Sequence, residues 1–466
     1  MRRLILAVQI LLLTGCTMGP NYTRPPVPDP GQYREDFPTR ESIATTAWWE
    51  LFGDSILVGL INTALENNPS LRATAARIAE ARANLGIVRA DLFPRLDYSV
   101  GGAYEGTLGK EGQTFDSITG LLTASWQLDL WGRIRRSNES ALQGLLATEE
   151  AYRGLTIMLV AETANAYFVL RDLDNRVVVA ERTLAVWRER QDVVQARFDA
   201  GMVSEVDFNQ SQIQVFEAEV TVQTFRRLRS QTENAISILL GRPPDTIPRG
   251  LPLQDQAIWP EVPTGLPSEL LERRPDILEA ERKLHAQTAR IGVAEALKFP
   301  QFNLNATLGR IYDDGSTDIF NLGAQLLGPI FTSGKNRRRV DVEVARTQQL
   351  IHAYEQTILG AYREVNDALI AVQTYDTELA LRRLQMAAAE NAAELSWVRY
   401  EGGMTSYIEV LDLQRSLFAS QLKASETLQL QLTSSVKLYQ ALGGGWVAEQ
   451  DTIVVRKPSN GEWDKD

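Results

Sequence analysis

The stretch RFDAGMVS at 197–204 returns later in the chain as RYEGGMTS at 399–406. The offset is 202 positions, and the same offset relates Leu240-Gly241 to Leu442-Gly443. Chance does not hold one register over so many residues, so the chain contains a two-fold repeat. We therefore expect two copies of one structural unit.

The order of the expected elements is the same in each copy. A first helix ends at Phe93-Pro94 or Phe299-Pro300, because proline disfavours helix in the residue before it. Two strands, a very long helix, a turn at Gly201 or Gly403 and a second helix follow. Glycine closes that second helix as well, since it tolerates positive φ. The expected strands cover 96–104, 118–130, 301–308 and 319–330.

The long helix of the first copy carries an apolar seam at alternating steps of three and four residues, the pattern of a coiled coil. Its members are Leu170, Leu173, Val177, Ala180, Leu184, Trp187, Gln191, Val194 and Phe198. Ile358, Tyr362, Val365, Leu369 and Val372 keep the rhythm in the second copy. At ~1.5 Å per residue, a helix from Gly132 to Gly201 is roughly 100 Å long, which predicts a tube or a stalk.

The expected strands alternate between apolar and polar residues. In 301–308, for example, Phe302, Leu304, Ala306 and Leu308 alternate with Gln301, Asn303, Asn305 and Thr307. This is the pattern of a transmembrane β-barrel, and a half-buried sheet of a soluble domain has the same period. The polar, glycine-rich loops between the strands favour the membrane. Four strands cannot close a barrel, and open edges in lipid leave backbone groups unpaired, so we expect the chain to oligomerise.

The N-terminus has the features of a secretory signal. Arg2 and Arg3 precede an apolar run over 4–13, which is too short to span a membrane. The run ends at Leu13-Thr14-Gly15-Cys16, and this is the only cysteine in the chain. The sequence here resembles the bacterial lipobox, whose cysteine is acylated. The alternative is an ordinary signal peptide with a chance cysteine. Thr17 is not acidic, which by the same resemblance favours the outer membrane.

The composition excludes several other functions. The net charge of −11 argues against nucleic-acid binding. His285 and His352 are the only histidines, both in expected helices without ligand spacing. The sequence contains no phosphate-binding glycine loop and no nucleophile elbow. We therefore expect no enzymatic activity, no metal and no cofactor other than a covalent lipid on Cys16.

The whole chain, from about residue 13 to 446, resembles the TolC-like outer membrane efflux proteins, specifically their NodT-type lipoprotein branch. This resemblance implies an α+β membrane protein that forms a homotrimer. Twelve strands would make one transmembrane barrel, and long α-helical coiled-coil hairpins would make a periplasmic α-barrel. The tunnel would dock a periplasmic adaptor and an inner-membrane transporter. The alternative is a lipoprotein adaptor of an efflux system, which would have one hairpin flanked by small β domains.

The resemblance also implies a candidate gate, because the tunnel of this family narrows just after the turn of the second copy. Glu409 and Asp412 match acidic gate residues, Ile408 matches an apolar constriction residue and Arg415 matches a tethering base. These four positions share one helical face. Asp207 takes the place of another gate carboxylate in the first copy. The alternative is a solvated helix face, as is usual for such charges.

Two further sets of residues receive expected roles. Adaptor contact is assigned to Gly201, Met202, Val203, Gly403, Met404 and Thr405, although some relatives carry a basic tether where this chain has Thr405. Inner-leaflet lipid contact is assigned to Arg133, Arg135, Arg136, Lys335, Arg337, Arg338 and Arg339. The expected domains are a signal peptide (1–15), a lipidated N-terminal extension (16–54), a first repeat (55–241), a proline-rich equatorial linker (242–267), a second repeat (268–443) and an equatorial tail (444–466).

Overall fold

A computed structural model describes residues 17–27, 31, 33, 48–106, 114–257, 270–313 and 315–444. The expected signal peptide, Cys16, much of the N-terminal extension, part of the linker and most of the tail therefore lie outside the described residues. The chain divides into two compact units, and each takes segments from both repeats. Unit 1 comprises Met1–Val27, Ala76–Ala151 and Asp276–Thr357, and unit 2 comprises Pro28–Ala75, Tyr152–Pro275 and Ile358–Asp466.

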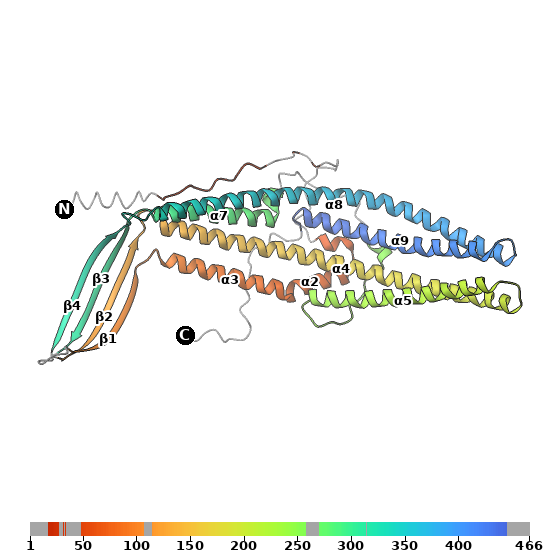
Figure 1. Ribbon diagram of the computed structural model, residues 1–466, viewed down its shortest axis with the longest axis horizontal. Coiled ribbons are helices and arrows are strands. Elements are labelled where there is room, and N and C mark those ends of the chain that lie inside the picture. Colours follow the sequence, from red (N-terminus) through yellow and green to blue (C-terminus); the bar gives the residue numbers. More distant parts are fainter. Residues whose placement is uncertain are drawn as a thin grey trace. The chain divides into compact units, whose positions relative to one another are not determined.

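Unit 1 contains one antiparallel sheet in the order β1-β2-β3-β4 (Figure 1). Its strands are β1 (Arg95–Gly106), β2 (Thr114–Leu128), β3 (Gln301–Tyr312) and β4 (Ser316–Leu327). The four expected strands are confirmed, and the sheet joins the two repeats through the β2–β3 pair. The expected ends of the second strand at 130 and of the last strand at 330 are wrong, since β2 ends at Leu128 and β4 at Leu327. Gly328 leaves the ladder because its backbone packs against Pro300, and Pro329 has no N–H to donate.

The strand register sorts the side chains into one apolar and one polar face. The apolar row Tyr98–Leu122–Leu308–Phe320 runs across all four strands, and Leu96–Ala124–Ala306–Leu322 lies next to it. On the opposite face runs the polar row Asp97–Thr123–Thr307–Asn321. Leu322 and Phe320 are largely exposed in the single chain. The alternation expected from the sequence thus becomes a continuous apolar surface.

Helices complete unit 1. They are most of α3 (Pro69–Ala90), the first part of α4 (Arg133–Asp199), most of α7 (Pro275–Ala296) and the first part of α8 (Lys335–Glu401). Ile291 and Ala294 of α7 pack against Val340 of α8. The extended segment 17–27 also belongs to this unit.

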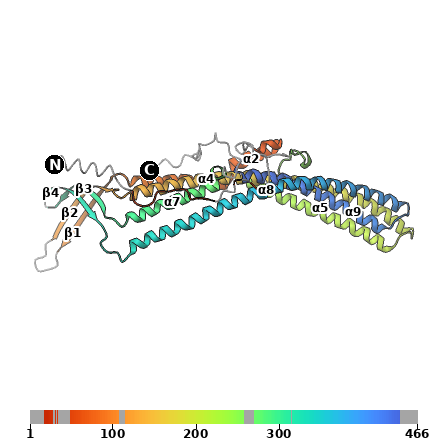
Figure 2. The same ribbon diagram turned by 90° about the horizontal axis from the view of Figure 1, so that it is seen from above.

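Unit 2 is built from two helical hairpins. In one, α5 (Glu205–Leu239) lies alongside α4, and in the other α9 (Tyr407–Ala441) lies alongside α8 (Figures 1 and 2). Shorter elements accompany them: η1 (Trp48–Phe52), α2 (Ser55–Asn67), η2 (Leu253–Asp255) and α6 (Leu270–Arg273). The predicted coiled-coil seam is confirmed, since Leu170, Ala180 and Val194 are fully buried.

In each repeat a break separates a short helix, α2 or α6, from the longer helix that ends before Phe93-Pro94 or Phe299-Pro300. Proline explains both breaks, because α3 begins at Pro69 and α7 begins at Pro275. At the first break the Asn68 side chain accepts hydrogen bonds from the backbone N–H groups of Ser70 and Leu71, and its amide donates to Leu239 O at 2.9 Å. Asn68 therefore caps α3 and ties it to the end of α5.

None of the helices in the described part of the chain combines the length and hydropathy that a bilayer-spanning helix needs.

Candidate functional site

The hairpin turns of the two repeats have the same geometry. The N–H of Met202 donates to Arg197 O at 2.8 Å, and the N–H of Met404 donates to Arg399 O at the same distance. Gly201 has a φ of 69° and Gly403 a φ of 71°, a backbone conformation that favours glycine. Such a six-to-one bond beside a left-handed glycine is a Schellman motif, so the repeated sequence encodes a helix stop.

Arg197 fastens the two turns to each other within unit 2. Its guanidinium donates to Tyr400 O at 3.2 Å and to Glu401 O at 3.0 Å. The same group lies 4.8 Å from the centre of the Tyr400 ring. The two hairpin tips therefore stand at one level.

A small apolar core supports the tips. Val194, Tyr400, Tyr407, Val410 and Leu411 form it, and Val203, Phe208 and Trp397 pack against it. Burial, and then the nearby Tyr400, raise the pKa of Tyr407 to about 12, so its phenol stays neutral at physiological pH. Val203 thus has a packing role, whereas Met202 is 72% exposed and Met404 66% exposed. Of the residues assigned to adaptor contact, the methionines are the ones that present apolar side chains to a partner.

The predicted gate residues share the exposed face of α9. Tyr407, Val410, Leu411 and Gln414 are buried on the other face, whereas Ile408, Glu409, Asp412 and Arg415 are exposed. The structure therefore brings these four side chains to one surface, as the spacing indicates. Their role as a gate stays a prediction at this point.

Each charged gate residue that has a described contact is held within its own chain. The Thr405 hydroxyl donates to Glu409. Arg399 Nη1 lies 3.9 Å from Glu409 Oε1. Arg415 Nη2 lies 3.6 Å from Glu217 Oε2 of α5, so this pair links the two hairpins. Thr405, at the position where some relatives carry a basic tether, thus contacts the predicted gate residue Glu409.

Asp207 has a structural function that the sequence analysis did not assign to it. Its carboxylate accepts hydrogen bonds from the N–H and hydroxyl of Ser204, and its own N–H donates to Ser204 Oγ at 3.2 Å. This reciprocal pair is a capping box at the start of α5. The signal was available in the sequence as Ser-x-x-Asp after the turn.

The basic cluster at the start of α4, which was expected to contact lipid, is held by contacts within the chain. For Arg136 the expected lipid contact is wrong. Arg136 is only 4% exposed. Its guanidinium donates to Asn21 Oδ1 and Glu139 Oε2, both at 2.7 Å. Arg135 pairs with Asp129, and Arg133 donates to Gln127. The second-copy residues Lys335, Arg337, Arg338 and Arg339 are all exposed.

Arg136 holds an N-terminal arm, residues 17–27, which is part of the expected N-terminal extension but whose docking site sequence reasoning missed. The Tyr22 ring stacks on His285 of α7 with 4.5 Å between ring centres. Arg24 makes two hydrogen bonds to Glu281, at 2.9 and 2.7 Å. Thr17 lies against Gly132, where β2 passes into α4, so closely that a side chain at Gly132 would collide with it. No local sequence signal indicates this docking, since its partners lie more than a hundred positions away.

A buried carboxylate organises unit 2. Asp54 caps α2 and accepts hydrogen bonds from Tyr167 Oη at 2.7 Å, Gln256 Nε2 at 2.8 Å and Leu251 N at 3.0 Å. Burial alone would raise the pKa of Asp54, but these hydrogen bonds hold it below its ordinary value. The site is structural, because its bonds to Tyr167, Leu251 and Gln256 tie distant segments of the chain together.

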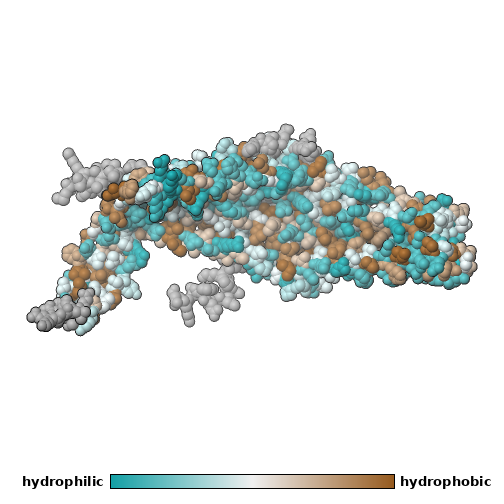
Figure 3. Space-filling model, in the orientation of Figure 1, coloured by the Kyte–Doolittle hydropathy of each residue, from teal (hydrophilic) through white to brown (hydrophobic). Residues whose placement is uncertain are grey.

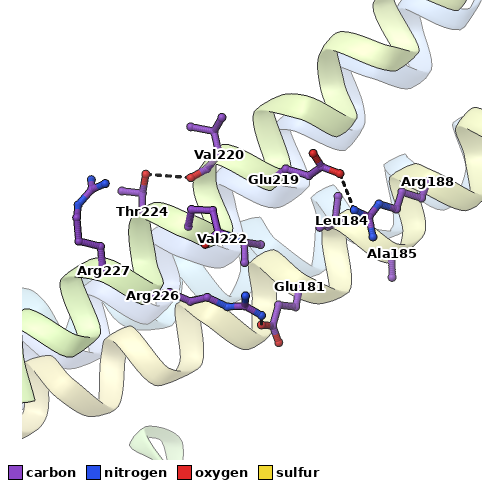
Figure 4. Close-up of a pocket in the computed structure, with 11 residues that line it drawn as sticks. Glu181, Leu184, Ala185, Arg188, Glu219, Val220, Val222, Thr224, Arg226 and Arg227 are labelled. Atoms are coloured by element: carbon purple, nitrogen blue, oxygen red, sulfur yellow. Dashed lines mark hydrogen bonds and ion pairs between the residues drawn. The ribbon is translucent and has the colours of Figure 1, made fainter. Parts of the chain in front are cut away.

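A charged groove of about 790 Å³ lies between α4 and α5 (Figure 4). Leu184 and Val222 line it, and an ion pair bridges the helices toward each end. These pairs are Arg188–Glu219 at 2.5 Å and Glu181–Arg226 at 2.6 Å. The groove is thus lined by paired charges of both signs, and the two ion pairs hold α4 and α5 of the hairpin together.

Among the described residues, no group of three or more His, Cys, Asp or Glu side chains could hold a metal ion. The His285 ring contacts Glu139 and Tyr22, and His352 contacts Glu355. Both histidines therefore take part in side-chain contacts within the chain.

Comparison with known proteins finds similarity over nearly the whole chain. The profile of the family described as "Outer membrane efflux protein" matches residues 60–242 and 266–444. The toluene efflux pump outer membrane protein TtgI of Pseudomonas putida is 36% identical over 466 residues, covering 95% of this chain and 98% of TtgI. The cation efflux system protein CusC of Escherichia coli O6:H1 is 31% identical over 447 residues, covering 94% of this chain and 97% of CusC.

A solved structure agrees with these sequence matches. The open state of the Neisseria gonorrhoeae MtrE outer membrane channel superposes with a TM-score of 0.84 at 32% identity. The superposition covers 92% of this chain and 98% of the MtrE chain.

Proposed function

We propose that this chain, which belongs to the outer membrane efflux protein family, is one subunit of a homotrimeric export duct with an acidic gate. The chain is an outer-membrane efflux channel that extends into the periplasm, and members of its family are channel proteins. The alternative of a periplasmic adaptor has no support in these matches, each of which is to an outer-membrane component or efflux protein. We infer no enzymatic activity for the chain.

The observation that carries the trimer is the sheet of unit 1. Its apolar face is continuous across four strands, and among the described residues its outer strands β1 and β4 each have one edge without a partner strand. Backbone groups must be paired inside lipid, so the edges have to meet strands of other copies. Three copies supply twelve strands, which is enough to close a transmembrane barrel.

The relatives suggest the partners of this duct. TtgI is named for an efflux pump, so we infer that this chain works with an inner-membrane transporter and a periplasmic adaptor. The exposed Met202 and Met404 at the hairpin tips suit such a partner, because methionine side chains are flexible and polarisable. The cargo itself is not fixed by these features, since one relative is named for toluene and another for cations.

The N-terminal arm supports lipidation of Cys16. Thr17 packs against Gly132 at the junction of β2 and α4. An acyl group on the preceding residue would then start at the end of a membrane strand, within reach of the bilayer. Several acyl chains anchor a protein stably, at about 0.8 kcal/mol per buried methylene.

Glu409 and Asp412 carry the gate in this proposal. In a trimer their exposed face on α9 would bring six carboxylates around one axis. Like charges gathered in a confined space attract cations and repel anions. The duct is then cation-selective near neutral pH.

Planar-bilayer recordings of the purified channel test the gate. We expect Glu409→Gln combined with Asp412→Asn to abolish the preference for cations. The control is Glu390→Gln with Glu394→Gln, another exposed acidic pair with helical spacing, on α8. It should stay cation-selective. Equal cation and anion permeability of the unmodified channel, or selectivity unaltered by the gate substitutions, would refute the proposal.

A further inference from the structure

The passage from strand to long helix differs between the two repeats in unit 1. In the first repeat Asp129 lies between β2 and α4, and its carboxylate accepts hydrogen bonds from the N–H groups of Ile134 and Arg135, at 3.0 and 2.9 Å. The same carboxylate pairs with the Arg135 guanidinium at 3.2 Å. The repeat offset of 202 positions puts Phe331 in the place of Asp129 in the second repeat. The second junction therefore lacks the carboxylate that caps the helix and compensates a cation in the first.

Four cations follow Phe331, and two of them have no partner. Lys335 and Arg337 are exposed, and neither makes a hydrogen bond or ion pair in the described part of the chain. Arg337 is the counterpart of Arg135, so it has lost the carboxylate that its equivalent binds. The other two cations have partners on their own helix, Asp341 for Arg338 and Asn336 for Arg339.

Apolar side chains precede these cations and are exposed as well. Phe331 is 85% exposed, and the neighbouring Ile330 is fully exposed. Leu326 and Leu327, at the end of β4, are also largely exposed. In Figure 3 strongly hydrophilic residues gather over the start of α8, and hydrophobic residues lie between them and the sheet. Exposed apolar residues beside cations are typical of a surface at the boundary of a bilayer, where acyl chains meet phosphates.

The segment also lies at a suitable place along the sheet. On β4 the apolar face runs from Phe320 to Leu326, which pairs with Phe302 of β3. Phe331 comes five residues after Leu326, and the first cation, Lys335, comes four residues after Phe331. The exposed apolar segment thus continues the surface that we assign to lipid, and the cations begin where the strand has passed into the helix.

The N-terminal arm, residues 17–27, occupies only the first of the two clusters. Arg136 donates to Asn21 of the arm, whereas its counterpart Arg338 contacts Asp341 of its own helix. Among the described residues no segment of the chain takes the place of the arm at the second cluster, whose four cations are all exposed. These cations are therefore available to a partner from outside the chain.

We propose that the second junction, residues 330–339, binds an anionic phospholipid of the leaflet next to the periplasm. Lys335 and Arg337 bind its phosphate, and Phe331 lies among its acyl chains. The proposal rests on the membrane placement of the sheet proposed above and names a lipid partner for it. The chain then meets this leaflet in two ways, because the first repeat holds the arm that follows Cys16 and the second repeat holds a free lipid.

Native mass spectrometry of the full chain, purified in detergent and stripped of lipid, tests the proposal. On titration, phosphatidylglycerol should bind more tightly than phosphatidylcholine, which has no net charge. Lys335→Gln combined with Arg337→Gln should weaken phosphatidylglycerol binding at least about tenfold and leave phosphatidylcholine binding unchanged. The control is Arg227→Gln with Arg383→Gln, which removes two exposed cations of unit 2 and should change neither.

A substitution that makes the second junction resemble the first provides another arm. In Phe331→Asp the new carboxylate should accept from the N–H groups of Asn336 and Arg337 and pair with the Arg337 guanidinium, as Asp129 does with its own neighbours. Phosphatidylglycerol binding should then fall about as much as on removal of the cations. Phe331→Leu is the control, since it stays apolar and should keep the lipid. The position is exposed, so the fold is not at stake.

The outcomes separate this inference from the proposed duct. Equal binding of the two lipids, or phosphatidylglycerol binding that survives both sets of substitutions, would overturn the lipid site. Displacement of the lipid by inorganic phosphate at matched concentration would show a simple anion site and overturn it too. Dissociation of the trimer in Phe331→Asp would assign the segment to a contact with a second copy and also overturn it. A chain that forms neither trimers nor pores in a bilayer overturns the proposed duct instead, whichever lipid it binds.

Discussion

Asp54 shows how one residue can hold several parts of unit 2. Its carboxylate is 1% exposed and accepts hydrogen bonds from Tyr167, Leu251 and Gln256, besides capping α2. These partners lie between 113 and 202 positions away in the chain. An aspartate before a helix predicts the cap from sequence alone. The other bonds could not be predicted, because no local pattern indicates them.

Asp54→Ala should lower the free energy of unfolding by about 3 kcal/mol or more, because it leaves a buried amide and a phenol without an acceptor and removes a cap. The measurement is the urea midpoint of the purified protein, followed by circular dichroism. Asp255→Ala is the control, since Asp255 is exposed at the nearby η2 and should cost little. Equal shifts of the two variants would contradict the role of Asp54.

Asp54 should also make stability depend on pH in a defined direction. Its pKa is lowered in the folded state, so its contribution is present above the unfolded value of about 3.9 and is lost as pH falls through the folded value. The difference in stability between the unmodified protein and Asp54→Asn should therefore shrink on acidification below about pH 4. A difference that stays constant or widens there would contradict the assignment.

The predicted gate face and the N-terminal arm show which features of single residues the sequence can predict and which it cannot. Helical spacing placed Ile408, Glu409 and Asp412 on one surface, because that spacing depends only on the helix itself. Arg136 was assigned to lipid, and the assignment was wrong because its partners come from the distant arm. Local geometry could be predicted, whereas contacts between distant segments could not.

At the scale of elements, the two-fold repeat and the positions of glycines predict most of the helices and turns. The long helices and the hairpin turns follow from the motif itself, and α4 and α8 have the same length of 67 residues. The ends of elements were harder. New helices begin at Pro69 and Pro275, and contact with Pro300 ends β4 before the expected residue 330.

The turn glycines provide a prediction at this scale. Gly403→Ala should destabilise the tip of the second hairpin by about 1 kcal/mol, because a Cβ disfavours its φ of 71°. Hydrogen exchange over 399–406 should speed up accordingly. The neighbouring Gly402→Ala is the matched control, since Gly402 has no positive φ. It should leave exchange nearly unchanged, and faster exchange in that variant than in Gly403→Ala would contradict the account.

At the scale of the whole molecule, the two repeats have diverged while keeping one fold. Both contribute two strands to the sheet and one hairpin to unit 2. Their equivalent basic clusters now differ, since Arg136 is buried under the arm and its counterpart Arg338 is exposed and paired with Asp341. The N-terminal arm contacts the first repeat through Arg136 and the second repeat through Glu281 and His285 of α7, so only one of the two equivalent basic clusters holds it.

This divergence predicts different results for two equivalent substitutions. Arg136→Ala should release the arm, because it removes charge-assisted hydrogen bonds to Met18 O and Asn21 and leaves Glu139 without that partner. Amide exchange over 17–27 should rise at least about tenfold, the equivalent of ~1.4 kcal/mol. Arg338→Ala, at the matching position of the second repeat, should leave the arm protected. Arg136→Lys should behave like the alanine variant, because a single ammonium cannot reproduce the several directed bonds of the guanidinium. Full protection of the arm in Arg136→Ala, or loss of protection in Arg338→Ala, would contradict the role of Arg136 in holding the arm.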